Sequence, residues 1–408
     1  MPLTRPLQFT TAAGEELGRA VARHGERMSK EAAVHDLQGT FAQDSVELLQ
    51  REGVFAACTP RAAGGGGLES LYDLTVLLSR IACHDPAVAT GAGMHLNLAW
   101  YYARTVRTSR GTEEDGFGAG GTSVEERWLS AMACDGMIVA STVAEHGCAP
   151  WQVETTARPT PGGWIVSGKK STVSISPAAT HFYARLKVLT EDGPVLGSAM
   201  IPADLPGVTV LDDWNGLGLR GSGSGQVIFD DVPVTAEHLR VRGPWGRRDT
   251  TAFEGRAASA SPLSGIYLGI AEAAAEWALD RGLSRRVEPS AGLRAMVADL
   301  KVALATARGA LHGALSQVDS ALRDAPPRTL EASVGRALLE EGVIAALIVE
   351  REAIKVIDLA MQISGAGAYS AAHPLSRMYR DVRAASFMRP YAPPEQWVDF
   401  LAAPHFPE

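Results

Sequence analysis

The sequence predicts an α+β protein in which two helical regions flank a central β-domain. Residues 1–135 place apolar side chains three and four positions apart, the period of a helix with one buried face. Residues 136–242 change to short apolar runs bounded by Pro, Gly, Asp and Asn, which is typical of strands. Residues 243–408 return to the helical period and are rich in alanine, so we expect a C-terminal helical bundle.

The helical period is clearest in two segments, one from each helical region. The N-terminal segment carries Leu71, Leu74, Leu77, Leu78 and Ile81 on one stripe. Between the N-terminal helices, Thr59-Pro60 and residues 64–67, which are four glycines, predict a loop. The stripe of the C-terminal segment consists of Leu263, Ile266, Ile270, Ala274 and Trp277.

The central region contains short predicted strands with no helical segment between them. This order favours an antiparallel barrel or sandwich, because parallel strands need long crossovers that are usually helical. The predicted strands span residues 137–141, 163–168, 181–189, 197–201, 208–211 and 226–229.

Composition narrows the class of protein. The 408 residues are 46% hydrophobic and 21% charged, with a formal net charge of −8 that argues against a nucleic-acid partner. No apolar stretch is long enough to cross a bilayer, and the first residues lack the apolar segment of a secretory signal. The four cysteines form no C-x-x-C pair and no zinc-ligand spacing, so we expect free thiols in a reducing cytoplasm and no metal site.

None of the common catalytic motifs occurs, but three segments carry a family resemblance. The first runs Gln362-Ile-Ser-Gly365-Ala-Gly367-Ala-Tyr and continues to Arg380-Asp381. Glycines directly after a helix most often end it, yet they also let backbone N–H groups approach an anion closely. The whole run resembles the C-terminal signature of the acyl-CoA dehydrogenase superfamily. In that family, Gln362, Gly365 and Gly367 would hold the FAD pyrophosphate of a neighbouring subunit.

The second segment runs from Gly216 to Val234 and contains Leu-Arg220-Gly-Ser222 followed by Val-Ile-Phe-Asp230. It resembles the family's L-G-x-R-x-S stretch and the V-x-F-D-x-V-x-V strand. Arg281, after Trp277-Ala278, matches the family arginine that reaches FAD across the dimer, although the F-G that follows in the family is absent.

The third segment resembles the two stretches that contact the flavin in this family. Thr142 and Gly147 fit the motif T-E-P-x-A-G-S, whereas Val143 and Ala144 replace its Glu-Pro. Downstream, Gly168-Lys-Lys-Ser-Thr-Val-Ser occupies the place of G-x-K-x-W-I-T. A hydroxyl at its last position can hydrogen-bond flavin N5 or O4. The flavin contacts that the resemblance implies here are Ser141, Thr142, Gly147, Cys148, Thr172, Val173 and Ser174.

The family's catalytic carboxylate is missing from its usual position. Acyl-CoA dehydrogenation removes a weakly acidic α-proton, which a positioned carboxylate must accept while a hydride passes to flavin N5. Nine residues after Arg380, where most members carry Glu, this chain has Arg389, and a guanidinium is no base at neutral pH. Glu254 lies near the alternative family position but one residue too early, about 100° around a helix. Glu395 is a third candidate.

A second branch of the family also lacks this Glu. The two-component flavin monooxygenases on this fold take reduced flavin from a partner reductase and hydroxylate through a flavin C4a-(hydro)peroxide. The chain resembles them at Pro390 and at His95, although a lone histidine on a helix is more often structural. A non-redox relative with structural flavin is a third hypothesis.

The resemblance implies the acyl-CoA dehydrogenase fold, with domains at 1–135, 136–242 and 243–408 and a C-terminal four-helix bundle. We expect FAD, with FMN or reductase-supplied reduced flavin as the alternative, in a homodimer or homotetramer. The first hypothesis is oxidation of an acyl thioester on CoA or a carrier protein, with Glu254 as base and electron-transfer flavoprotein as acceptor. The alternative is a reduced-flavin monooxygenase with a flavin reductase partner and His95 in the catalytic site.

Overall fold

The computed structural model describes residues 4–109, 123–247, 253–283, 290–323, 331–388, 400–402 and 405–406; of residues 108–109 and 253–260 it describes the backbone alone. The helices are α1 (Ala12–Gln38), α2 (Gln43–Arg51), α3 (Leu71–Ala82), α4 (Pro86–Ser109), α5 (Val124–Cys134), α6 (Phe253–Trp277), α7 (Ala291–Arg323), α8 (Ala332–Ser364) and α9 (Pro374–Val382). The strands are β1 (Val139–Thr142), β2 (Thr156–Thr160), β3 (Gly163–Lys170), β4 (His181–Thr190), β5 (Gly193–Pro202), β6 (Val208–Val210), β7 (Val227–Thr235) and β8 (Leu239–Pro244).

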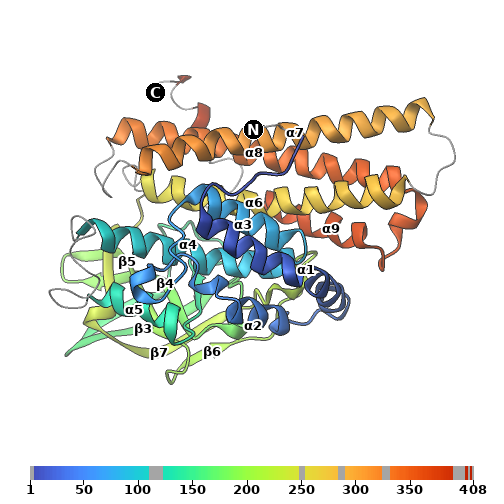
Figure 1. Ribbon diagram of the computed structural model, residues 1–408. Coiled ribbons are helices and arrows are strands. Elements are labelled where there is room, and N and C mark those ends of the chain that lie inside the picture. Colours follow the sequence, from blue (N-terminus) through green and yellow to red (C-terminus); the bar gives the residue numbers. More distant parts are fainter. Residues whose placement is uncertain are drawn as a thin grey trace.

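The structure confirms the predicted fold class. Figure 1 shows the strands on one side, the long helices α6 to α8 on the other, and α3 and α4 between them. Two glycines let α6 approach α3 closely. A Cβ at Gly265 would lie 2.4 Å from the carbonyl oxygen of Thr75, and one at Gly269 would lie 2.3 Å from that of Ser79. Larger side chains would force these helices apart.

The N-terminal helices begin at side chains that satisfy their first N–H groups. Thr11 caps α1 by accepting from the Gly14 N–H, and the α3 residue Asp73 accepts from the N–H of Thr11 at 2.9 Å. Ser123 and Glu126 form a reciprocal capping box at the start of α5. No helix in the described ranges combines the length and apolar character that crossing a membrane requires.

The eight strands form one sheet in the order β6-β7-β3-β2-β4-β5-β8, with β1 paired to β4. The sequence prediction of an antiparallel domain is wrong for two pairs, because β1 and β2 both run parallel to β4. The alternation of apolar residues is the same in parallel and antiparallel strands. The relative direction of two paired strands therefore depends on the path of the chain between them. The strand prediction also missed β2 and β8. The first is polar and contains Pro159, which lies beyond the two residues of β2 that pair with β4.

Candidate functional site

The segment after β3 has the strained backbone that often marks a functional site. Thr172 and Ile175 both adopt left-handed φ angles, 57° and 64°, which β-branched residues rarely do. Between them, Val173 and Ser174 are buried, whereas Thr172 is exposed. Of the three residues predicted here to contact a flavin, Thr172 is therefore the one whose side chain reaches the surface.

Backbone and hydroxyl contacts hold this segment against the turn that carries Arg220. The Val173 and Ile175 N–H groups donate to the carbonyls of Gly225 and Ser222 at 2.9 and 2.8 Å. The Ser174 hydroxyl lies 2.9 Å from that of Ser224, which in turn lies 2.7 Å from the Ser222 hydroxyl. The structure thus joins two of the motifs found in the sequence. It also engages the Ser174 hydroxyl with protein, and its flavin contact stays a prediction.

The other predicted flavin segment is β1 and the loop that follows it. Thr142 is buried and its hydroxyl donates to the Tyr183 carbonyl at 3.1 Å, and Ser141 pairs in register with the same β4 residue. Gly147 has a left-handed φ of 72°, and no described atom lies within 4 Å of where its Cβ would stand. Burial raises the pKa of the neighbouring Cys148 thiol, with Glu145 and Glu154 adding to the effect. Gly147 therefore lies on an open turn, next to the half-buried Cys148.

An ion pair that we did not predict from the sequence closes this loop. Glu145 Oε1 lies 2.6 Å from Lys170 Nζ, and the two side chains are 6% and 0% exposed. Lys170 stands at the lysine of the G-x-K motif, which was the only sequence feature that pointed to it. Nothing local identified Glu145 as its partner, because the two residues are 25 positions apart.

His95 is held by backbone groups on both sides of its ring. Its Nδ1 accepts from the Val139 N–H at 3.0 Å, so its Nε2 carries the proton and donates to the Phe55 carbonyl at 2.8 Å. The ring is fully buried, and burial lowers its pKa to about 4. This geometry supports a structural role for His95. As a neutral side chain it links α4, β1 and the loop before α3 by hydrogen bonds, and it has no free ring nitrogen for proton transfer.

The predicted pyrophosphate residues form a second group at the end of α8. Gly365 ends the helix with a φ of 83°, and a Cβ at the exposed Gly367 would have no described atom within 4 Å. Gln362 is also exposed. Arg281 lies in a π-helical turn, Ala278–Gly282, whose last residue packs against Ser364, so the structure brings Arg281 beside the glycine turn. The Arg281 guanidinium stacks on Trp277 at 4.5 Å.

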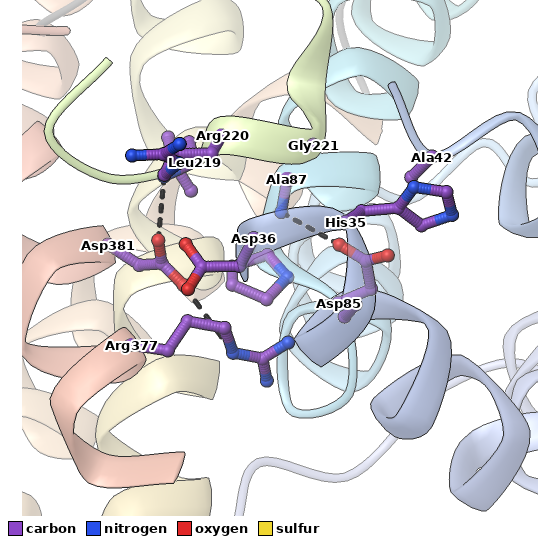
Figure 2. A pocket seen from close by; sticks show the side chains of 12 residues that line it. His35, Asp36, Ala42, Asp85, Ala87, Leu219, Arg220, Gly221, Arg377 and Asp381 are labelled. Carbon is purple, nitrogen blue, oxygen red and sulfur yellow. Dashed lines mark hydrogen bonds and ion pairs between the residues drawn. The ribbon is translucent and has the colours of Figure 1, made fainter. Parts of the chain in front are cut away.

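A small polar cavity lies behind the Arg220 turn, where all three regions of the chain meet (Figure 2). Its volume of about 10 Å³ is far below that of a flavin or substrate pocket. Asp85 and Arg377 line it, together with Arg220 and Asp381. Asp381 Oδ1 accepts from the Leu219 N–H at 2.6 Å, and burial raises the pKa of its carboxyl to about 6. The cavity therefore belongs to the scaffold of the site.

The candidate bases divide between described and undescribed residues. Arg389, Pro390 and Glu395 lie outside the described residues, and Glu254 lies in the first turn of α6, where only the backbone is described. Each buried carboxylate in the described part of the chain already accepts a hydrogen bond from the protein. These carboxylates are Asp36, Asp73, Asp85, Glu126, Glu145, Glu272 and Asp381.

Comparison with known proteins identifies two domains and relatives of nearly full length. Residues 139–232 match the acyl-CoA dehydrogenase middle domain, and residues 262–388 match the acyl-CoA dehydrogenase C-terminal domain. The chain is 38% identical to L-evernosamine nitrososynthase from Micromonospora sp., over 96% of this chain and 90% of that protein.

Two solved structures show the same fold. KijD3 in complex with FMN and dTDP-3-amino-2,3,6-trideoxy-4-keto-3-methyl-D-glucose superposes with a TM-score of 0.88 at 33% identity, covering 99% of this chain and 95% of that one. Butyryl-CoA dehydrogenase from Megasphaera elsdenii superposes with a TM-score of 0.78 at 19% identity, covering 98% and 100%.

These comparisons confirm the predicted family and the general class of flavin-dependent oxidoreductases, and they leave the reaction itself open. FMN in the KijD3 complex agrees with the FMN alternative inferred from the sequence. With matching domains over residues 139–232 and 262–388 and a relative along almost its whole length, the chain belongs to the acyl-CoA dehydrogenase family.

Proposed function

We propose that this protein is a flavin-dependent N-oxygenase that oxidises the amine of an amino sugar carried on a nucleoside diphosphate. The observation that carries the proposal is the 38% identity to an L-evernosamine nitrososynthase along 96% of the chain. Amino sugar nitrososynthase DnmZ from Streptomyces peucetius, 33% identical over 93% of the chain, supports the same reaction class. We place this hypothesis above oxidation of an acyl thioester.

The missing carboxylate agrees with oxidation at nitrogen. Acyl-thioester oxidation breaks a C–H bond and needs a base, whereas an unprotonated amine is itself a nucleophile with an available electron pair. Arg389 at the family's base position cannot accept the α-proton that the first reaction removes, whereas the second reaction needs no base there. The buried carboxylates of the described residues are engaged with protein groups, which supports the same choice.

The chain has features that fit a flavin. The open glycine turns at Gly147 and Gly367 expose backbone where a bulky group can approach, and the exposed Thr172 stands on a strained turn. A reduced flavin, which we propose a partner reductase supplies, would provide the two electrons that each oxygenation consumes. In each round one oxygen atom of O2 goes to nitrogen and the other leaves as water. The first round converts the amine to the hydroxylamine. The second converts the hydroxylamine to an N,N-dihydroxy compound, which loses water to give the nitroso group.

The test measures oxygen transfer and flavin reduction separately. The protein is incubated with FMN, a flavin reductase, NADH and the dTDP-amino sugar bound in the KijD3 complex, under isotopically labelled O2. We expect labelled oxygen on the sugar nitrogen, and no product when either O2 or the reductase is left out. Mass spectrometry of the sugar reports the result.

The competing hypothesis, acyl-thioester oxidation, predicts that the substrate reduces enzyme-bound flavin in the absence of oxygen. If an acyl-CoA rapidly bleaches enzyme-bound flavin, the protein is a dehydrogenase and N-oxygenation is the wrong assignment. In that case Glu254→Gln should slow the bleaching at least about a hundredfold, the lower end for loss of a general base. The matched control is Glu276→Gln, an exposed carboxylate near the end of the same helix.

A further inference from the structure

A buried ion pair joins the two segments predicted to contact the flavin ring. Lys170 is the last residue of β3 and leads directly into Thr172 and Ser174. Its ammonium donates to Glu145 Oε1 at 2.6 Å and to the Arg185 carbonyl at 2.5 Å. Burying a charge of this kind is costly unless it is paired and hydrogen-bonded, and here it is both.

The carboxylate of Glu145 closes the loop between β1 and β2. Besides Lys170, it accepts from the backbone N–H groups of Glu154 and Thr155 at 2.6 and 3.0 Å, and from the Thr155 hydroxyl at 2.6 Å. One side chain near the start of the loop therefore binds its end. The Ser171 N–H adds a second link by donating to the Ala144 carbonyl at 3.1 Å.

These contacts set the position of one flavin segment relative to the other. Gly147 and Cys148 lie inside the loop that Glu145 closes, and Thr172 lies two residues beyond Lys170. The sequence has lost the Glu of the family's T-E-P motif, since Val143 and Ala144 replace Glu-Pro. A carboxylate returns two positions after the lost Glu, at Glu145, and the structure shows that it reaches the lysine of the G-x-K motif.

We propose that Glu145 and Lys170 are a pair of positioning residues. Their ion pair holds the Gly147–Cys148 turn and the Thr172–Ser174 segment at the separation that flavin binding requires. The inference rests on the proposed flavin binding. Neither residue is assigned a step in oxygen transfer. Their role is to keep the two segments in place when the cofactor enters and leaves, which a reductase-fed enzyme must allow repeatedly.

The charge state of the Glu145–Lys170 pair depends on pH, whereas a contact between uncharged side chains would not. Burial lowers the pKa of Lys170 to about 8, and Glu145 opposes that shift. Burial raises the pKa of Glu145, but Lys170 and the Thr155 and Glu154 hydrogen bonds outweigh it and hold the pKa below its usual value. Arg185 and Cys148 are the other ionisable groups acting on Lys170. At neutral pH both partners are charged, and above about pH 8 the lysine becomes neutral and leaves a buried anion unpaired.

The experiment measures the FMN dissociation constant by fluorescence quenching from about pH 6 to about pH 10, a range that spans the charge change of Lys170. We expect the wild-type protein to bind FMN at least about tenfold more weakly above the Lys170 transition, because an unpaired buried charge destabilises the loop. Lys170→Met should bind weakly at every pH. In Glu145→Gln the transition should move to lower pH, because the neutral side chain no longer holds the proton on the lysine.

The matched control is Glu154→Gln, because this exposed side chain pairs with Lys187 while its backbone N–H still donates to Glu145. If a single variant fails to fold, Glu145→Gln/Lys170→Met removes both charges together, and it should bind FMN weakly with no pH dependence. Wild-type affinity and an unchanged pH profile in all three pair variants would overturn the positioning role. A wild-type protein without flavin affinity at any pH would overturn the proposed function as well.

Discussion

At the scale of single residues, His95 shows that a match to a family motif does not by itself establish a catalytic role. The resemblance to flavin monooxygenases pointed to this histidine, yet backbone groups satisfy both of its ring nitrogens. Phe55 lies before α3 and Val139 opens β1, so the ring joins two regions of the chain that lie far apart in sequence. Its place behind β1 supports a contribution to the site through structure, not through proton transfer.

His95 should make the protein sensitive to acid. Its pKa is about 4 in the folded state against 6.5 in the unfolded state, so the unfolded chain binds a proton first as pH falls. The contribution of neutral His95 to the free energy of unfolding is fully present above about pH 6.5. It is lost as pH falls towards 4, and the total loss is ~3 kcal/mol.

His95→Gln, which cannot be protonated, should have a lower melting temperature than wild type at pH 7. Between pH 7 and about pH 5, however, its melting temperature should fall less than that of wild type. Asp381 contributes with the opposite sign, since its raised pKa favours the folded state at acid pH, but it is common to both proteins. The exposed His146→Gln is the control and should behave as wild type. Equal acid sensitivity in the His95 variant would contradict this account.

At the scale of elements, the turn before Arg220 shows how closely the β-domain and α9 pack. Leu219 adopts a left-handed φ of 51° and donates its N–H to Asp381. Gly218 stands against the backbone of α9, and a Cβ there would lie 2.4 Å from the carbonyl carbon of Arg380. Because this turn continues into Ser222 and Ser224, its position also determines where the Ser174 segment lies.

Gly218→Ala should therefore push the turn away from α9 and break the Leu219–Asp381 hydrogen bond. We expect a loss of roughly 2–4 kcal/mol, from overpacking and an unsatisfied buried carboxylate. The control is Gly313→Ala in α7, where a Cβ meets no described atom within 4 Å. That change should raise stability by about 0.5–1 kcal/mol, because alanine is the better helix former. Thermal melting of the two variants decides, and equal melting temperatures would show that the α9 backbone yields.

At the scale of the whole molecule, the polar cavity joins the N-terminal helices, the β-domain and the C-terminal bundle (Figure 2). Four buried polar atoms of its lining have no hydrogen-bond partner among the described residues: Asp85 Oδ2, Arg220 Nε, and Arg377 Nε and Nη1. Asp85 and Arg377 are 1% and 8% exposed. Arg220 and Arg377 bring two positive charges to the lining, and Asp85 and Asp381 bring two carboxylates, since Asp36 is paired with Arg380. Of these, Arg377 Nε lies 3.9 Å from Asp381 Oδ2. A neutral molecule that both accepts and donates fits this lining better than an anion.

We expect one ordered water in this cavity, whose size matches the minimum of about 10–15 Å³ that a water needs. A crystal structure from bromide-soaked crystals should show a water between Asp85 and Arg377 and no anomalous bromine peak there. A bromine peak would instead identify an anion site. Asp85→Asn places an amide group that can donate towards Arg377, so we expect it to cost ~1–3 kcal/mol of stability. Asp358→Asn, at a half-exposed ion pair with Arg383, should cost much less.

Features that depend on near neighbours along the chain could be predicted from the sequence. The helical stripe of Leu71 to Ile81, the strand-rich middle and the glycine turn after Gln362 all follow from short-range periodicity and backbone preference. The missing base at Arg389 needed only the count of residues from Arg380.

Which distant residues meet could be read only from the three-dimensional structure. It made β1 parallel to β4, paired Glu145 with Lys170, enclosed His95 between two backbone groups and brought Asp85, Arg220 and Arg377 around one cavity. A local pattern carries no record of such contacts, because they depend on how the chain returns across the sheet and on which buried charges must find partners.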